Sequence, residues 1–202
     1  MIPQRLIRSV PAETSELVEF YWWVACDWHP LWDAVTYRDP INPTEFPITS
    51  PVWSLAKSGA QLAGLVRLEA VAASGGVWLD SDVYLYRPLT PLLGLGCFAA
   101  WEDANVVPDA VFGAEPGHPA IKACLDEAVR RIQTDNTDWR TGNGAWSTGP
   151  GVFTSILPGR DDVTLLGPEA FYPVHYTRKQ DCREYRPTPE NYGIHEWAGS
   201  WL

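Results

Sequence analysis

The sequence predicts an α/β domain with a largely parallel central sheet. Residues 53–74 and 119–132 carry apolar side chains at helical spacing, and short apolar runs such as 77–79 and 97–101 have the length of buried strands. Asp80-Ser81-Asp82 directly follows one of these runs. Ligands of such sheets gather beyond the carboxyl ends of the strands, so the carboxylate pair falls where a site is expected.

The N-terminal third predicts two strands, one helix and a loop. Residues 4–10 alternate weakly and end before Pro11, which favours a first strand followed by a turn. A helix is expected over 13–28, where acidic residues open the segment and apolar ones recur at helical spacing. Residues 32–37 predict a second strand. The segment 38–51 contains four prolines, which remove backbone donors, and so predicts a loop.

The helix predicted over 53–74 should end at Gly75, a residue suited to a left-handed cap. The clearest helix follows Pro119, which fits the first turn, and its apolar stripe places Cys124 in the core. Residues 134–151 have no periodicity and predict a long loop near a site. The stripe of the second helix consists of Ile121, Cys124, Leu125, Ala128, Val129 and Ile132.

Length and composition favour one domain over residues 1–202, large enough to bury a core. The four cysteines form neither a CxxC pair nor a zinc pattern, so we expect them to be reduced and structural. The net charge of −10 argues against nucleic acid or an anionic membrane as the main partner. No stretch approaches the roughly 18 apolar residues of a membrane span, so a cytoplasmic protein is expected.

The carboxylate pair is the strongest chemical signal. An isolated Asp-x-Asp is commonly a solvated turn, but this one follows Gly75-Gly76 and a buried strand, with Arg67 on the preceding helix. Oxygen ligands suit Mg²⁺ or Mn²⁺, and the absence of clustered cysteine and histidine argues against zinc. A divalent cation held by Asp80 and Asp82 would in turn hold a diphosphate.

These residues resemble the core of glycosyltransferase family 32, which contains the DXD motif. The family is related to α-mannosyltransferases, α-1,4-galactosyltransferases and clostridial glucosylating toxins. The resemblance covers nearly the whole chain in order and spacing. The matching segments are Arg67, Gly75-Gly76, Asp80-Ser81-Asp82, residues 2–11, Thr148-Gly149-Pro150-Gly151, His195-Glu196-Trp197 and Ser200-Trp201.

The resemblance implies a nucleotide-diphospho-sugar transferase fold (GT-A, Rossmann-like) and a metal-dependent, retaining transferase. Such an enzyme moves a hexose from a UDP- or GDP-sugar and uses Mn²⁺ or Mg²⁺. The acceptor stays open between a glycan, a lipid-linked glycan and a protein side chain. Nucleic-acid partners and an integral membrane segment are not expected.

The resemblance also implies roles for individual residues. Asp82 would bind the metal directly, Asp80 would contact the donor ribose and the metal shell, and His195 would complete the metal or diphosphate site. Trp201 would close over the leaving group. The implied donor-binding residues are Ser9, Val10, Arg67, Asp80, Ser81 and Trp201.

Two further positions bear on the reaction. Glu102 and Asp103 follow the strand predicted over 97–101, so with Asp80 and Asp82 they are candidate catalytic residues, able to orient an acceptor hydroxyl or support an oxocarbenium ion. Gly64 departs from the pattern, because relatives usually carry an Asp three residues before the arginine. That Asp helps to hold the donor, so the donor's identity stays open.

Two other functions fit parts of the sequence. A haloacid-dehalogenase-type phosphohydrolase would use Asp80 as nucleophile with Lys122 and Asp161-Asp162, but its motif normally begins the domain. A non-catalytic carbohydrate-binding domain could hold structural Ca²⁺ with Asp80 and Asp82. Such modules are usually all-β, which the helical segments disfavour.

Overall fold

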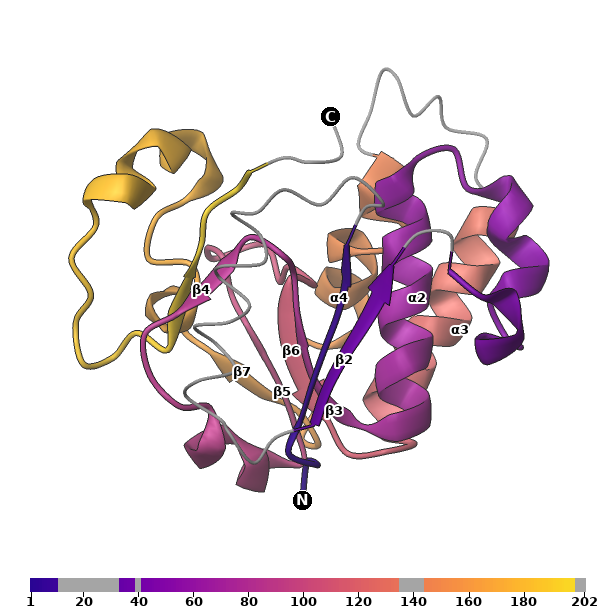
Figure 1. The fold of residues 1–202 in the computed structure, drawn as a ribbon, viewed down its shortest axis with the longest axis horizontal. Coiled ribbons are helices and arrows are strands. Elements are labelled where there is room, and N and C mark those ends of the chain that lie inside the picture. Colours follow the sequence, from indigo (N-terminus) through magenta and orange to yellow (C-terminus); the bar gives the residue numbers. More distant parts are fainter. Residues whose placement is uncertain (11–32, 39–40, 135–143, 199–202) are drawn as a thin grey trace.

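A computed structural model describes residues 1–10, 33–38, 41–134 and 144–198. Its core is a six-stranded sheet in the order β2-β1-β3-β6-β5-β7 (Figure 1). Within it β6 is antiparallel to both neighbours, whereas the other pairings are parallel. This confirms the predicted α/β class with its largely parallel sheet. The strands are β1 Arg5–Val10, β2 Asp33–Arg38, β3 Gly76–Leu79, β5 Cys97–Ala100, β6 Val111–Ala114 and β7 Thr164–Leu166.

Three helices lie along one face of the sheet: α2 (Gly59–Ser74), α3 (Pro119–Thr134) and α4 (Pro150–Ile156) (Figure 1). Alternation along the strands explains the two faces, because successive side chains point to opposite sides. In β3, Trp78 joins the helix-side core, while Val77 and Leu79 join the core on the other side. Both faces are therefore covered, and the ends of the strands remain to form a site.

The second face is covered by short segments instead of long helices. The 3₁₀ helix η3 (Thr90–Leu95) and the residues after η5 (Pro168–Ala170) pack there. Phe171 and Tyr172 are almost fully buried against this face. Their burial brings the C-terminal part of the chain close to the end of β3.

A separate two-stranded sheet joins distant parts of the sequence. Strand β4 (Val83–Leu85) pairs antiparallel with β8 (Gly193–His195), so that Val83 lies opposite His195. In Figure 1 the magenta β4 runs beside the yellow C-terminal segment, away from the helices. The sequence did not predict either strand. Their pairing carries His195 to the residues that follow β3.

Two predicted boundaries need correction. The helix expected from residue 53 begins at Gly59, because Ser58 caps it by accepting a hydrogen bond from the N–H of Gln61. The preceding residues form a 3₁₀ helix, η2 (Ser50–Leu55). The expected loop over 38–51 contains a further short turn, η1 (Pro43–Glu45), and the helix predicted over 13–28 lies outside the described residues.

Cys97, Cys124 and Cys182 are buried free thiols, and Cys124 lies in the helix-side core as predicted. Among the described residues, the structure contains no helix that is both long and apolar enough to cross a bilayer.

Candidate functional site

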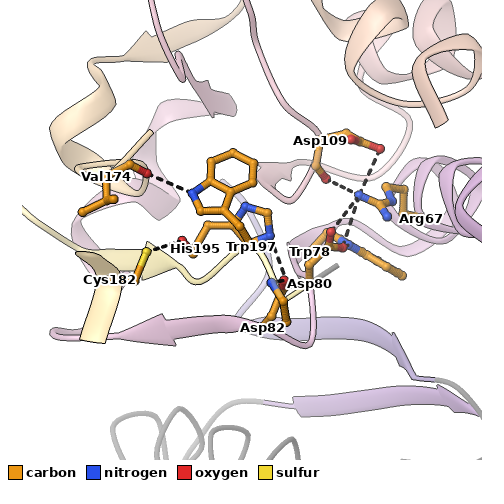
Figure 2. Close-up of polar contacts among 10 residues, drawn as sticks. Arg67, Trp78, Asp80, Asp82, Asp109, Val174, Cys182, His195 and Trp197 are labelled. Atoms are coloured by element: carbon orange, nitrogen blue, oxygen red, sulfur yellow. Dashed lines mark hydrogen bonds and ion pairs between the residues drawn. The ribbon is translucent and has the colours of Figure 1, made fainter. Parts of the chain in front are cut away.

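The inner half of the site consists of Arg67, Trp78, Asp80 and Asp109, and Arg67 contacts the other three. It lies on α2 with only 5% of its side chain exposed, and its Nη1 contacts the carboxylates of Asp80 at 3.2 Å and Asp109 at 2.9 Å. The same nitrogen donates to the backbone oxygen of Asp109 at 2.8 Å, and Nε donates to the oxygen of Ala63. The guanidinium also lies over the ring of Trp78. A buried arginine with these partners is fixed in one position (Figure 2).

Asp80 is held mainly by this inner cluster. The indole N–H of Trp78 donates to its Oδ1 at 2.7 Å, and Arg67 Nη1 donates to its Oδ2 at 3.3 Å. Burial nevertheless raises the pKa of Asp80, against the lowering effect of Arg67. Burial likewise raises the pKa of Asp109 to about 6, although Arg67 opposes it. The inner half thus concentrates two carboxylates around one arginine.

Asp82 is held by the C-terminal segment. His195 Nε2 lies 3.0 Å from its Oδ1, and the backbone N–H of Ala198 donates to its Oδ2 at 2.9 Å (Figure 2). Burial would raise the pKa of Asp82, but the charge and hydrogen bond of His195, with the Ala198 N–H, lower it to about 2. Burial would lower the pKa of His195, yet Asp82 raises it overall. Each group therefore stabilises the charged form of the other.

The residues fit a divalent cation. Asp80, Asp82 and His195 can each offer one ligand atom, and these atoms all lie within 4.8 Å of one another. Two carboxylate oxygens and an imidazole nitrogen suit Mn²⁺ and, with fewer protein ligands, Mg²⁺. In addition, His195 Nδ1 is buried without a hydrogen-bond partner among the described residues. His195 ends strand β8 and is only 7% exposed.

Trp197 fixes the turn that brings this segment onto Asp82. It has a φ of 56°, the left-handed region that bulky residues rarely adopt. Its ring lies 4.1 Å from that of His195, and its N–H donates to the oxygen of Val174. The strained turn lets His195 and Ala198, on either side of it, reach the same carboxylate. Strain of this kind is typical of functional sites.

Gly64 has a packing reason to be glycine. A β-carbon at this position would lie 2.7 Å from both the backbone oxygen and Oγ1 of Thr148. Thr148 is fully buried and donates to the backbone oxygen of Gln61. The residues before α4 therefore occupy the space into which an Asp at position 64 would extend.

Of the other residues predicted to bind the donor, three lie in the described part of the chain. Ser9 is buried in β1, and Ser81 lies in the turn closed by the Val83 N–H on the Asp80 oxygen. Val10 ends β1, and Trp201 lies outside the described residues. Their roles in donor binding stay predictions.

Glu102 and Asp103 lie at the end of β5 and differ in role. Asp103 accepts hydrogen bonds from the N–H groups of Asn105 and Val106, so it holds a local turn. Glu102 is buried, which raises its pKa, and its Oε1 lies 3.3 Å from His175 Nε2. Of the two, only Glu102 has a buried oxygen without a hydrogen bond among the described residues.

Sequence reasoning did not find Asp109, Ala198 or Trp78. Asp109 follows Pro108, before a strand that was not predicted, and Ala198 contributes only its backbone. Trp78 lies inside the predicted strand, two residues before Asp80 and hence on the same side. That spacing was the one available signal for these three.

Comparison with known proteins connects this geometry to an enzyme class. The chain is 24% identical over 157 residues to an uncharacterized glycosyltransferase of Acanthamoeba polyphaga mimivirus. The match covers 75% of this chain and 62% of the viral protein, so the chain spans less than two thirds of that relative. No protein-family profile matches the chain.

Solved structures show the same architecture. GlyE of Streptococcus pneumoniae, a glycosyltransferase, superposes with a TM-score of 0.60 at 14% identity, covering 100% of this chain and 56% of GlyE. The PaToxG glycosyltransferase gives 0.58 at 16% identity over 77% of this chain and 68% of its own. The galactosyltransferase LgtC, solved with donor and acceptor sugar analogs, gives 0.54 at 10% identity over 98% and 88%. This chain has the GT-A fold.

Proposed function

We propose that this protein is a metal-dependent, retaining glycosyltransferase of the family 32 type, which transfers a hexose from a nucleotide-diphosphate sugar. The observation that carries the proposal is the cluster of Asp80, Asp82 and His195 beyond the end of β3 in a GT-A fold. The relationship to a viral protein named as a glycosyltransferase supports it. The donor would be a UDP- or GDP-sugar.

Asp80, Asp82 and His195 would hold Mn²⁺ or Mg²⁺ against the donor diphosphate. When bound, the cation would act as a Lewis acid that stabilises negative charge on the leaving diphosphate. In the transfer, the bond from the anomeric carbon to the diphosphate oxygen breaks, and its electron pair leaves with the nucleoside diphosphate. The acceptor oxygen bonds to that carbon, and its proton passes to the leaving diphosphate.

The chain's own residues would prepare this step by orientation. Arg67 fixes Asp80 through a buried ion pair, and the Ala198 N–H fixes Asp82, so neither carboxylate must reorganise during the reaction. Ser9, Val10, Ser81 and Trp201 are proposed to bind the donor. Glu102 is proposed to act on the acceptor side.

The test compares wild type with Asp82→Asn, a substitution of nearly equal shape that removes the metal-binding charge. Asp181→Asn, on the exposed surface, is the matched control. All three proteins are screened by thermal shift and donor hydrolysis against UDP- and GDP-hexoses with saturating Mn²⁺. We expect Asp82→Asn to lose at least about a hundredfold in turnover, as is typical of a lost transition-state contact. Hydrolysis by this variant at the wild-type rate would sink the proposal.

The fold argues against the phosphohydrolase alternative. In the antiparallel register of β3 and β6, Gly76 lies opposite Ala114 and Leu79 opposite Val111. The chain therefore leaves β6 at the end of the sheet far from Asp80, and Lys122 follows there near the start of α3. Asp162 pairs with Arg160 on the surface. These groups do not converge on Asp80.

A further inference from the structure

A line of aromatic rings leads from the candidate metal ligand to the protein surface. The His195 ring lies 4.1 Å from that of Trp197, which lies 6.1 Å from Tyr176. Tyr176 in turn lies 4.5 Å from the ring of His175. Tyr176 is 56% exposed, an unusual exposure for an aromatic side chain so close to a buried site.

Polar groups lie along one edge of the His175 ring, which contacts this exposed ring. His175 Nε2 is 3.3 Å from Glu102 Oε1 and 3.6 Å from Asp103 Oδ2. The other ring nitrogen, Nδ1, accepts the backbone N–H of Thr177, so Nε2, the nitrogen beside the carboxylates, carries the proton in the neutral ring. His175 and Asp103 are partly exposed, which makes the edge accessible from solvent.

Glu102 supplies the observation that points to a ligand. Its side chain is 7% exposed, and apart from the ion-pair contact with His175 Nε2 its Oε1 has no hydrogen bond among the described residues. Buried polar atoms are costly without partners, so this oxygen favours a further hydrogen-bond donor such as a ligand hydroxyl.

We propose that Glu102, Asp103, His175 and Tyr176 form a binding subsite for a neutral sugar unit of the acceptor. A pyranose has an apolar face of C–H groups and a rim of hydroxyls. The exposed ring of Tyr176 would take the apolar face, and the carboxylates of Glu102 and Asp103 would accept hydroxyl hydrogen bonds. Two carboxylates at one edge repel an anionic sugar. The acceptor is thus a neutral glycan.

This inference rests on the proposed function, because the subsite has a role only beside a bound donor. The experiment uses the whole chain with Mn²⁺ and the donor found by the hydrolysis screen. The acceptor probes are methyl glycosides of glucose, galactose and mannose, a methyl glucuronide and a serine-containing peptide. Transfer to at least one neutral glycoside, and none to the glucuronide or peptide, is the expected result.

Variants then separate binding from folding. Tyr176→Ala is expected to raise the KM for the neutral acceptor about tenfold, with the KM for the donor changed far less, whereas Tyr176→Phe keeps the ring and the wild-type acceptor KM. Ile48→Ala, which trims an equally exposed apolar side chain elsewhere, is the matched control. Glu102→Gln should also raise the acceptor KM.

Three results would overturn the inference. Transfer only to the peptide or the glucuronide contradicts the acceptor class, and an unchanged acceptor KM in Tyr176→Ala contradicts the subsite. Donor hydrolysis without transfer to any neutral glycoside also contradicts the class, while the proposed function stands. Failure to bind or hydrolyse any nucleotide-sugar overturns both proposals together.

Discussion

The two aspartates of Asp80-Ser81-Asp82 are two residues apart but depend on different parts of the molecule. Asp80 is held by Arg67 and Trp78, which lie within the central sheet and the helix packed on it. Asp82 is held by His195 and Ala198, more than a hundred residues later in the chain. One half of the candidate metal site is therefore part of the core, and the other half is completed by the C-terminal segment.

Because of this difference, substitutions in the two halves should have different effects on stability and on ligand binding. A substitution in the inner half leaves a buried charge without its partner, so it should mainly lower the free energy of unfolding. Damage to the outer half releases a segment held by a two-stranded sheet and a few ring contacts, so it should cost ligand binding first.

The largest effect on stability is expected for Arg67→Met. This substitution leaves Asp80 and Asp109 buried without their cation, which should lower the free energy of unfolding by about 3–5 kcal/mol. Urea unfolding followed by tryptophan fluorescence measures it. The control is Arg130→Met on α3, where the side chain is 61% exposed. Equal losses in the two variants would contradict a special role for the inner cluster.

Gly64→Ala should produce the next largest loss of stability. The added methyl group would meet the backbone and side chain of Thr148 at 2.7 Å, and such overpacking costs about 1–3 kcal/mol. In Gly94→Ala the new methyl group has no neighbour within 4 Å, so this variant controls for the general effect of removing a glycine. Equal unfolding midpoints for the two variants would show that α2 can move away from Thr148.

Trp197→Ala probes the outer half. It removes the ring beside His195 and the hydrogen bond to Val174, so Mn²⁺ affinity should fall about tenfold while the unfolding midpoint changes little. Calorimetric titration with manganese chloride measures the affinity. Trp197→Phe keeps a ring and loses only the hydrogen bond, so an intermediate affinity is expected. A large drop in stability with unchanged affinity would reverse the distinction between the two halves.

The smallest effect is expected for Glu127→Gln, which removes a partly exposed ion pair on α3 that contrasts with the buried Arg67 pair. Hydrogen bonds from Arg130 and Arg131 lower the pKa of Glu127 to about 2, below its ordinary 4.5. Its stabilisation is therefore present above pH 4.5 and is lost as the pH falls toward 2. Because the partner Arg130 is 61% exposed and the pair lies at the surface, the difference from wild type should be less than about 1 kcal/mol at neutral pH. Unfolding curves at pH 7 and pH 3 test this, since the difference should shrink at pH 3.

Much of the fold was predictable because it depends on local patterns. The strand β1, the helix α2 and the apolar stripe of α3 each follow from side-chain periodicity, and the structure confirms all three, although α2 begins six residues later than predicted. The strands β4 and β8 were not predicted. They have three residues each, too few to show a period, and each exists only because the other pairs with it.

In the candidate site too, the residues recognisable from local sequence differ from those that only the fold brings together. Asp80 and Asp82 were recognisable because the pair follows Gly75-Gly76 and a buried strand, with Arg67 on the preceding helix. Asp109 was not, since nothing in its sequence neighbourhood shows that it meets Arg67, 42 residues earlier in the chain. The role of Trp197 was equally hidden, because its left-handed backbone is a property of the folded turn.

The sequence by itself determined the α/β architecture and the position of two carboxylates beyond the end of β3, since both depend on residues close together in the chain. Only the tertiary structure decided which groups surround those carboxylates. The contact between His195 and Asp82 spans 113 positions, and no local pattern encodes a contact at that separation. Burial, a property of the whole fold, then sets their charge states.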